Sequence, residues 1–543
     1  MVQPQDMQKE AAPAPAGEAP ISKKAEKKNA RAAMKEARKA KATEAAKRAI
    51  VTVTNFDEGQ YGDMVMVQSA SKSSRVWTRI ETLNASAAGS KIWLRARLEY
   101  VRDAGKRAFL VLRQTPFTIQ AMVAEDAETP RDMVKYLKKI PLESIVDVEA
   151  LVNVAPNPIT STTQSDVELS IAKCFVISAA VPILAMQVAD AKRPLAEDEA
   201  EEKQENDVSM PTVGRDVRLD NRWIDMRATA NHAIFRVQSA VAQYFREFFL
   251  QRKFVEVHTP KLISAASEGG ADVFKVDYFG RPAYLAQSPQ LYKQMCMNGD
   301  LHGVFEIGPV FRSERSFTHR HMCEFTGMDF EHEIYEHYHE VLDTLGDLFI
   351  YIFDKLNENN AVDLEMINAQ YPFGKLQYPR KTLVLSFSEA IQLLKAAGDL
   401  EADELKDIST PQEKHLGQLI KKKYGTDFYI IDRYPMSARP FYTMPCPDDP
   451  RFSNSYDVFL RGEEITSGAQ RIHDHALLVE RALANDPPID ISTIQSYTDS
   501  FMSGSPPHGG AGIGLERVVM LFCGLKNIRL TSLFPRDPKR VTP

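Results

Sequence analysis

Apolar and polar residues alternate most clearly between residues 91 and 181. In the segment 92–100 every second residue is apolar, and the residues between them are Trp, Arg, Arg and Glu, the pattern of a half-buried strand. Similar runs predict further strands near 107–113, 116–123, 145–154 and 166–178, with a helix near 130–139. Three strands, a helix and two strands is the element order of an OB-fold, a five-stranded barrel that often binds oligonucleotides. We therefore expect an OB-fold β-barrel over residues 91–181.

The pattern becomes mixed after residue 213, where helical periodicities and strands share one long segment. A helix is predicted over 231–252, because Ala233, Val237 and Tyr244 recur near one face. The remaining boundaries follow from composition: a linker over 51–90, an acidic hinge over 182–212, and one large α/β unit over 213–543 with a packed insertion at about 360–440. The role of this insertion cannot be read from its pattern.

Charge is distributed unevenly along the chain. Residues 1–20 are rich in Pro and Ala and are expected to be a disordered tail, whereas residues 21–50 hold eleven Lys and Arg against three Glu. Strong helix formers dominate this second segment, and a basic stripe recurs at steps of four at Lys23, Lys27, Arg31, Lys35 and Lys39. The segment 21–50 is predicted to be a basic helical extension. It is either a solvated tail or an arm that binds phosphates by charge.

Composition excludes several classes of protein. The chain has 543 residues, of which 44% are hydrophobic, so a sizeable core is expected. No apolar run approaches the ~18 residues that a membrane span requires, which argues against an integral membrane protein. The five cysteines are isolated, which argues against a disulfide framework and a cysteine zinc site and favours a reducing compartment. The first twenty residues carry three acids and no apolar core, so no signal peptide is expected.

Two segments carry residues suited to nucleotide chemistry. Residues 304–331 read as a hairpin in which Arg312 ends the first strand, while Phe325 and Asp329 share one face of the second. A guanidinium binds phosphate and an aromatic ring stacks on a base, so this hairpin suits a nucleotide. Residues 509–536 read as a glycine-rich strand followed by a helix, with Arg517 near the helix N-terminus, where an anion is favoured. Neither the Walker nor the dinucleotide-binding fingerprint occurs here.

Together with the Pro-ended strand of residues 254–274, these segments resemble the motifs of class II aminoacyl-tRNA synthetases. The segments QSPQLYKQ (287–294), THRHMCEFTGMD (318–329), SGAQR (467–471) and LFPR (533–536) narrow the resemblance to aspartyl-tRNA synthetases of the eukaryotic cytoplasmic type. The resemblance covers residues 91–543 and implies a multidomain α+β protein. Its parts would be a basic tRNA-binding extension, an OB-fold barrel that reads the anticodon, and a catalytic domain built on an antiparallel β-sheet flanked by helices.

The resemblance also implies the roles of individual residues at the nucleotide. Arg312 would hold the α-phosphate of ATP, Phe325 would stack on adenine, and Arg517 would bind the γ-phosphate. Glu314 and His321 would lie near the phosphates and the ribose. A Mg²⁺ ion would be coordinated by Asp457 and Glu464, since two carboxylates and phosphate oxygens suit a hard cation.

Further roles concern the amino acid, the tRNA and a second subunit. Lys293 and Arg471 would bind the side-chain carboxylate of aspartate, and Asp329 its α-ammonium group. The remaining implied contacts are Ser267, Glu268, Ser288, Gln290 and Ser467 for aspartate, Phe109, Gln120 and Glu168 for the anticodon, and Pro260 for a homodimer interface. From pattern alone, Phe109 also fits a core position of the barrel.

The implied reaction joins L-aspartate to its tRNA through an aspartyl-adenylate formed from ATP, in the cytoplasm. Two alternatives remain open. One is an asparaginyl-type or non-discriminating synthetase, against which Lys293 argues, because asparaginyl relatives lack a lysine there. The other is a non-catalytic RNA-binding paralogue, against which the retained Arg312, Asp329 and Arg517 argue. The sequence does not decide tRNA discrimination or membership of a larger synthetase assembly.

Overall fold

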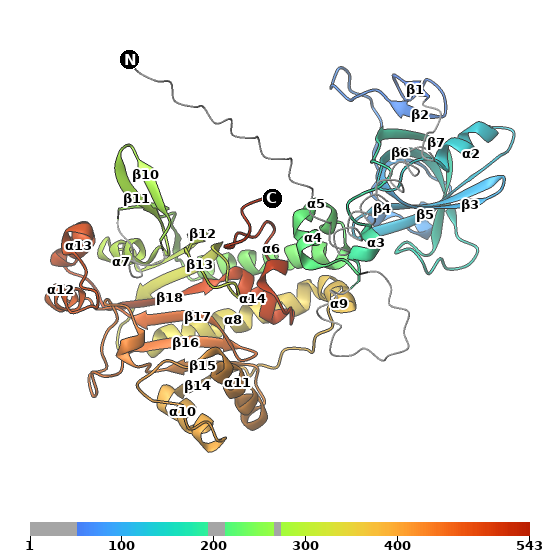
Figure 1. The fold of residues 1–543 in the computed structure, drawn as a ribbon. Helices are drawn as coiled ribbons and strands as arrows, with labels where there is room; N and C mark the ends of the chain where they lie inside the picture. Colours follow the sequence, from blue (N-terminus) through green and yellow to red (C-terminus); the bar gives the residue numbers. More distant parts are fainter. Residues whose placement is uncertain (1–50, 194–211, 265–272) are drawn as a thin grey trace, which may run out of the picture. The chain divides into compact units, whose positions relative to one another are not determined.

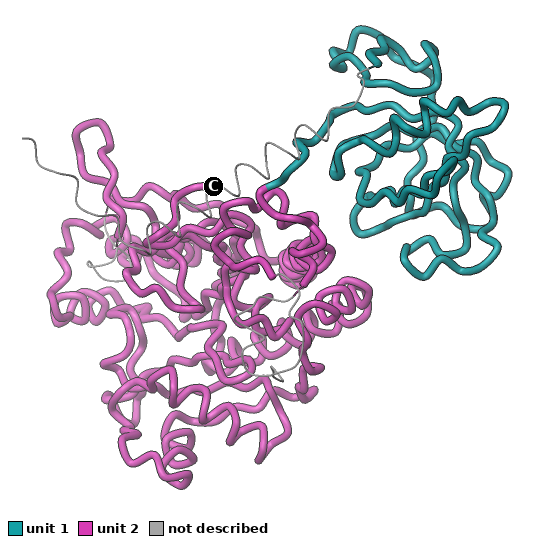
Figure 2. The backbone as a smooth tube through the Cα atoms, turned by 45° about the vertical axis from the view of Figure 1, so that its right-hand side comes forward, with its two compact units in different colours: residues 1–184 teal, residues 185–543 magenta. Residues whose placement is uncertain are grey.

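The computed structural model describes residues 51–193, 212–264 and 273–543, and the chain divides into two compact units (Figure 2). Unit 1 comprises residues 1–184 and unit 2 comprises residues 185–543. Several predictions fall outside the described residues: the tail 1–20, the basic extension 21–50 with its five named cations, most of the hinge 182–212, and the loop residues Ser267 and Glu268. No helix among the described residues is long and apolar enough to cross a membrane.

Unit 1 contains the predicted β-barrel (Figure 1). Its elements are β3 (Lys91–Ala104), β4 (Arg107–Gln114), β5 (Phe117–Ala124), α2 (Arg131–Leu137), β6 (Ile145–Val154) and β7 (Val167–Ser178). The strand order β7-β5-β4-β3-β6 closes on itself, because β6 also pairs with β7. Alternate residues of β3, such as Leu94 and Leu98, are fully buried. The predicted five-stranded OB-fold barrel is thereby confirmed.

Residues 51–90 depart from the prediction of a linker. They form β1 (Thr52–Val53), β2 (Tyr61–Met64), η1 (Ile80–Thr82) and η2 (Ala85–Ala87). Strand β2 pairs in parallel with β7, and Ile80 and Leu83 are buried in the barrel core. These apolar residues are isolated in a polar stretch and therefore make no periodic pattern, although each fills a place in the core.

Unit 2 is built on an eight-stranded sheet in the order β14-β15-β16-β17-β18-β13-β12-β8. Its strands are β8 (Val255–Glu256), β12 (Gly303–Phe311), β13 (Glu324–Glu333), β14 (Leu383–Ser386), β15 (Phe428–Asp432), β16 (Ser455–Leu460), β17 (Glu463–Gln470) and β18 (His508–Gly514). The pairs from β15 to β12 are antiparallel, and only the two edge pairs are parallel. This sheet is the antiparallel core that the resemblance implied.

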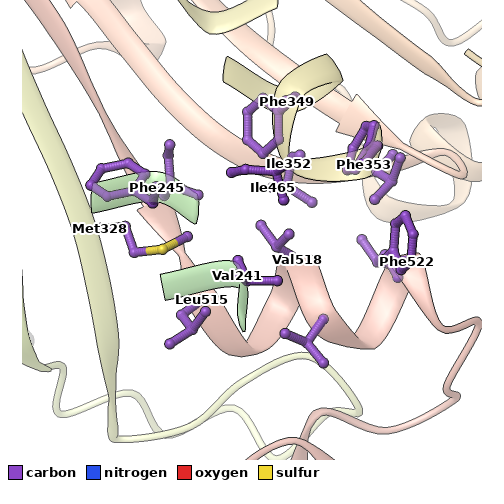
Figure 3. Packing of buried hydrophobic residues seen from close by; sticks show 14 of the residues in the cluster. Val241, Phe245, Met328, Phe349, Ile352, Phe353, Ile465, Leu515, Val518 and Phe522 are labelled. Atoms are coloured by element: carbon purple, nitrogen blue, oxygen red, sulfur yellow. The ribbon is translucent and has the colours of Figure 1, made fainter. Parts of the chain in front are cut away.

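Helices cover one face of this sheet (Figure 1). They are α6 (Thr229–Gln251), α8 (His339–Asn359), α9 (Ala361–Gln370) and α14 (Leu515–Phe522). Val241 and Phe245 of α6 meet Phe349 of α8 and Val518 of α14 over the strand residue Met328 (Figure 3). Because residues alternate along β13, Met328 and Phe330 enter this core, while Gly327 and Asp329 lie on the opposite face, where the candidate site is found.

The insertion at 360–440 is packed structure that completes the sheet. After α9 it contributes β14, α10 (Phe387–Ala396), α11 (Thr410–Tyr424) and β15. Its own core includes Phe387, Leu394, Leu416 and Ile420. Helix α11 begins at a capping box between Ser409 and Gln412, which satisfies backbone N–H groups at its start.

Smaller elements surround the sheet. They are α3 (Val188–Ala191), α4 (Arg215–Asp220), α5 (Arg222–Asp225), β9 (Leu262–Ile263), β10 (Lys275–Tyr278), β11 (Arg281–Leu285), α7 (Gln290–Asn298), η3 (Met436–Ala438), α12 (His475–Leu483), η4 (Ile491–Thr493), α13 (Gln495–Ser500), η5 (Phe501–Ser503) and η6 (Ile528–Leu530). The predicted hinge 182–212 contains helix α3. Its residues Val188 and Ala191 are buried, so this part of the hinge is packed structure.

Candidate functional site

A cavity of about 440 Å³ opens on the strand face that the helices leave uncovered. Residues from β13, β17, β18 and the first turn of α14 line it. The predicted site residues that line the cavity are Ser288, Gln290, Arg312, Glu314, His321, Phe325, Asp329, Glu464, Ser467, Arg471 and Arg517. Segments separated by more than 200 residues therefore meet in one cavity.

The predicted nucleotide residues Arg312, Phe325 and Arg517 lie near one another in the cavity wall. Arg312 directly follows β12, and its guanidinium lies 5.6 Å from the ring of Phe325, which belongs to the paired strand β13. Arg517 lies in the first turn of α14, and its Nη1 donates to the backbone oxygen of Glu464 at 2.9 Å. Burial lowers the pKa of Arg517, although an arginine remains a cation at neutral pH. Two cations beside an aromatic ring fit a nucleoside phosphate.

Glu314 and His321 lie on the loop between β12 and β13. The backbone N–H of Ser316 donates to Glu314 Oε1 at 2.8 Å, and hydrogen bonds from Ser316 lower the pKa of Glu314. Burial, and then the charge of Arg517, lower the pKa of His321. The His321 imidazole is therefore neutral at pH 7, and its Nδ1 shares a hydrogen bond of 2.6 Å with Thr318 Oγ1.

The two predicted metal carboxylates differ in their surroundings. Glu464 lines the cavity, and its pKa is raised by burial and then by the neighbouring charge of Asp457. Asp457 lies behind the cavity wall and accepts two hydrogen bonds from Arg439, at 3.0 and 2.8 Å. Among the described residues, no group of three or more His, Cys, Asp and Glu side chains forms a site that could hold a metal ion. Two adjacent carboxylates fit Mg²⁺ only when phosphate oxygens supply most of the coordination.

Arg439 is a site residue that sequence reasoning missed. It lines the cavity, and Nη1 also donates to Ser467 Oγ at 2.8 Å. Its guanidinium lies 4.0 Å from the ring centre of Tyr434. It therefore joins Asp457, predicted to bind metal, to Ser467, predicted to bind aspartate. No local motif marks it, because its partners lie 18 and 28 residues further along the chain.

A second group of site residues forms a floor of buried charges. Lys293 of α7 is buried, with Nζ 3.1 Å from Asp329 Oδ1 and 3.3 Å from Glu331 Oε2. Arg471 Nε donates to Glu331 Oε1 at 2.8 Å, and Nη2 donates to Gln290 Oε1 at 3.1 Å. Arg471, Gln290 and Asp329 line the cavity, whereas Lys293 lies behind Asp329. Two cations and two carboxylates therefore balance one another in this floor.

Glu331 is the second residue missed by the role assignments, although it shares a strand face with Asp329. Burial alone would raise its pKa, but Arg471 and Lys293 outweigh burial and lower the pKa of Glu331. By contrast, burial raises the pKa of Asp329 against the opposing effect of Lys293. Glu331 therefore remains a fixed anion that orients both cations of the predicted aspartate subsite.

Glycines of β18 allow this floor to form. A Cβ on Gly510 would lie 2.1 Å from the backbone oxygen of Phe330 and 2.4 Å from Glu331 Oε2. A Cβ on Gly512 would lie 3.1 Å from Asp329 Oδ1. Glycine at these two positions therefore allows β18 to pack closely against Phe330, Glu331 and Asp329 of β13.

Glu516 follows the glycine-rich strand and is a buried carboxylate of the cavity wall. Its two oxygens accept hydrogen bonds from the backbone N–H of Thr326, at 3.1 and 3.0 Å. Burial raises the pKa of Glu516 to about 7. Because it ties α14 to β13, Glu516 links the helix that carries Arg517 to the strand that carries Phe325.

The predicted anticodon residues lie on the outer face of the barrel in unit 1. Phe109 is only partly buried and is covered by the guanidinium of Arg102 at 4.7 Å, so the alternative of a core residue is wrong. Gln120 Nε2 donates to Glu168 Oε2 at 3.0 Å across neighbouring strands. An aromatic ring, an amide and a carboxylate on one face suit unstacked bases.

Pro260 lies between β8 and β9 at the end of the sheet and is exposed. This position is compatible with the predicted interface, which stays a prediction. The predicted aspartate contacts Ser267 and Glu268 lie outside the described residues.

The chain is similar to a known protein family and to individual members of it. Residues 214–538 match the family described as tRNA synthetases class II (D, K and N). The aspartate–tRNA ligase, cytoplasmic, of Homo sapiens is 52% identical over 489 residues, which cover 90% of this chain and 96% of that protein.

Solved structures agree. An aspartyl-tRNA synthetase from Entamoeba histolytica is 44% identical, with a TM-score of 0.82, and the match covers 91% of this chain and 98% of that one. An asparaginyl-tRNA synthetase from Pyrococcus horikoshii, complexed with asparaginyl-adenylate, is 27% identical, with a TM-score of 0.73, over 87% of this chain and 100% of that one. The chain therefore belongs to the class II tRNA synthetases, and within them to the family of the aspartate–tRNA ligases.

Proposed function

We propose that the cavity activates L-aspartate with ATP and transfers it to the tRNA for aspartate. The observation that carries this proposal is the floor formed by Lys293, Asp329, Glu331 and Arg471 beside Arg312, Phe325 and Arg517. Arg471 and Asp329 line the same cavity, one as a cation and the other as a carboxylate. A zwitterion with an acidic side chain needs both, and the group of Arg312, Phe325 and Arg517 suits a nucleotide.

The chemistry proceeds in two steps. The α-carboxylate of aspartate attacks the α-phosphorus of ATP, forming the mixed anhydride and releasing pyrophosphate. The 3′-hydroxyl of the terminal tRNA adenosine then attacks the anhydride carbonyl and displaces AMP. Arg312 neutralises the α-phosphate, Arg517 neutralises the γ-phosphate, and Phe325 fixes the adenine. Catalysis arises from positioning and charge stabilisation rather than from a covalent enzyme intermediate.

Glu464 and Asp457 are the carboxylates that would hold Mg²⁺, with phosphate oxygens completing its coordination. The ion would supply charge neutralisation of the phosphates. Arg439 keeps Asp457 in a fixed orientation beside Glu464. Gln290 orients Arg471 for the side-chain carboxylate of the amino acid, and Ser288 and Ser467 supply further polar contacts.

Recognition of tRNA involves other parts of the chain. Phe109, Gln120 and Glu168 contact anticodon bases, and the extension of residues 21–50 adds phosphate contacts by charge. The active form is a homodimer that includes Pro260 in its interface. The enzyme acts in the cytoplasm, which the names of its relatives support.

Pyrophosphate exchange with ATP in the absence of tRNA tests this proposal. Aspartate, asparagine and lysine are compared at equal concentration with the full-length protein. Exchange with aspartate alone is expected. Exchange with asparagine would favour an asparaginyl-type enzyme, and exchange with none of the three amino acids in folded protein would favour an RNA-binding paralogue.

A further inference from the structure

The loop between β12 and β13 is held from outside the sheet by the insertion. Arg320 lies on this loop and lines the cavity beside Arg517. Its Nη1 donates to Glu413 Oε2 at 2.6 Å, and its Nη2 donates to Thr410 Oγ1 at 2.6 Å. Both acceptors belong to the first turn of α11, so the insertion contacts a residue of the cavity directly.

A second contact between the β12–β13 loop and α11 lies next to the first and runs through Glu463. Glu463, the first residue of β17, has a carboxylate oxygen 3.2 Å from His319 Nε2 on the loop. Lys414 Nζ of α11 lies 3.4 Å from the same oxygen. Because Glu464 follows directly, the residue that ties the loop to α11 neighbours a predicted metal ligand.

Helix α11 is itself fixed against the sheet. A Cβ on Gly417 would lie 2.4 Å from the Cα of Gly462 in the turn between β16 and β17, so the two backbones are in direct contact. Leu416 and Ile420 of the helix are fully buried in the core of the insertion. Helix α11 is therefore packed closely against the turn that leads into the strand carrying Glu464.

We propose that α11 is a positioning element for ATP, in which Glu413 and Thr410 hold the Arg320 guanidinium toward the triphosphate. This inference rests on the proposed function of the cavity. Two of the five guanidinium N–H groups are used by α11, and within the described part of the chain the other three are left for phosphate oxygens. Glu413 acts through Arg320 and is a positioning residue.

The position of Arg320 favours ATP over tRNA as the ligand. Arg320 lies in the same cavity as Arg312, Phe325 and Arg517, close enough that its charge acts on Arg517. Its side chain is 14% exposed, so it faces an enclosed space more than the open surface. A guanidinium held by two short hydrogen bonds loses little conformational freedom when phosphate binds.

The test compares Glu413→Gln, Thr410→Val and Arg320→Met with the full-length protein, using pyrophosphate exchange with aspartate. Each variant is expected to raise KM for ATP by about tenfold, with KM for aspartate changed less than about twofold, since a charge-assisted bond is lost. The double variant Glu413→Gln/Arg320→Met should raise KM for ATP no further than Arg320→Met alone, because Glu413 acts through Arg320. Thr410→Val removes one hydroxyl and keeps the variant close to the native fold.

Lys421→Met is the matched control. Lys421 lies in the last turn of the same helix, away from the loop, and forms an ion pair at 2.8 Å with Asp427, which follows the helix. This substitution is expected to leave KM for ATP and KM for aspartate unchanged. Arg517→Met is the reference for the cavity itself, and it should raise KM for ATP whether or not α11 matters.

Three results would overturn the inference. Unchanged KM for ATP in Glu413→Gln and Thr410→Val, with a raised KM for ATP in Arg517→Met, would exclude a role of α11 in ATP binding. The assignment of the cavity to ATP would then stand. Equal increases in KM for ATP and aspartate would indicate a general structural role. Unchanged exchange kinetics together with a raised KM for tRNA in aminoacylation would assign Arg320 to tRNA. If Arg517→Met also left ATP kinetics unchanged, the proposed function of the cavity would fail with it.

Discussion

Arg439 and Asp457 form a two-point ion pair, with Nη1 donating to Oδ1 at 3.0 Å and Nη2 donating to Oδ2 at 2.8 Å. A guanidinium of the chain thus neutralises one of the two carboxylates that the resemblance assigns to Mg²⁺. The second carboxylate, Glu464, faces the cavity. The protein therefore keeps two neighbouring acids close together by means of a fixed cation, independently of any bound metal ion.

Replacing Arg439 with Met should make the protein depend on Mg²⁺ for stability. The variant leaves the buried Asp457 carboxylate unpaired beside Glu464, which costs about 3 kcal/mol or more of folding free energy. Mg²⁺ should then raise the thermal midpoint of the variant more than that of the wild type. Differential scanning fluorimetry with and without millimolar MgCl₂ measures this difference.

Arg433→Met provides the matched control for this prediction. Arg433 pairs with Asp448 at 2.7 Å on the same connecting segment, but the two side chains are 41% and 63% exposed. Its loss should change stability little, because exposed ion pairs contribute little. An equal Mg²⁺ response in Arg439→Met and the wild type would contradict the role given to Arg439.

Replacing Lys293 with Met should abolish aspartate activation while ATP binding persists. Lys293 lies between Asp329 and Glu331, so its loss takes the cation away from the buried Asp329 and leaves Glu331 paired with Arg471. Aspartate-dependent pyrophosphate exchange should fall at least about a hundredfold, and stability should fall by ~3 kcal/mol. Equilibrium binding of ATP to folded variant is the internal control. Native aspartate kinetics in this variant would refute the subsite assignment.

Gly510→Ala and Gly514→Ala should behave differently, although both lie in β18. The added Cβ at Gly510 meets backbone and a carboxylate within 2.4 Å, whereas at Gly514 the nearest atom is 3.6 Å away. Overpacking at Gly510 should cost about 1–3 kcal/mol and displace Glu331 from Arg471. Thermal midpoints and aspartate exchange rates of both variants measure the contrast. Equal behaviour of the two would show that the close approach is not required.

Glu516 should make stability fall between about pH 4.5 and pH 7. Its folded pKa of about 7 lies above the value of 4.5 for a free Glu, so the folded state prefers the protonated form. The stability from this group is fully present below pH 4.5 and is lost as pH rises through 7, a change of ~3 kcal/mol. Glu516→Gln mimics the protonated form and should be stabilised relative to the wild type at pH 8 but not at pH 4.5. A constant difference between the two proteins from pH 5 to pH 8 would be inconsistent with the raised pKa.

Deleting residues 1–50 should weaken tRNA binding and flatten its salt dependence. The deleted segment contains the eleven cations of residues 21–50, and each cation that neutralises a phosphate contributes to the slope of affinity against salt. The truncation stops before β1, so the β1–β2–β7 pairing is kept. Filter binding across a salt series measures the slope, and aspartate-dependent exchange without tRNA should be unchanged. A salt slope equal to that of the full chain would exclude the extension from tRNA binding.

Sequence periodicity predicted the elements in which apolar residues recur at a regular spacing over several turns or alternate positions. The barrel strands, the helix at 229–251 and the β12–β13 hairpin all have long, regular patterns, and the structure places them close to the predicted bounds. The linker prediction for 51–90 departs from the structure because single buried residues such as Ile80 leave no period.

The candidate site was predictable only where a motif carried it. Most of the residues implied by the resemblance line one cavity, but their mutual contacts could not be inferred. Lys293 meets Asp329 across 36 residues, and Arg471 meets Glu331 across 140. Such contacts depend on strand pairing, so the partners of Arg439 and the place of Lys293 behind the cavity wall emerge only in three dimensions.

The alternation along β13 has a consequence for how this chain can change over time. Met328 and Phe330 enter the helix-covered core, while Gly327 and Asp329 face the cavity. Gain or loss of one residue within the strand would exchange these two sets, placing carboxylates against phenylalanines and apolar side chains against the ligand. Substitutions in β13 can accumulate one by one, but changes of its length cannot. In an insertion–deletion library, this strand should therefore be depleted of every one-residue length variant, whereas the β10–β11 turn should tolerate them.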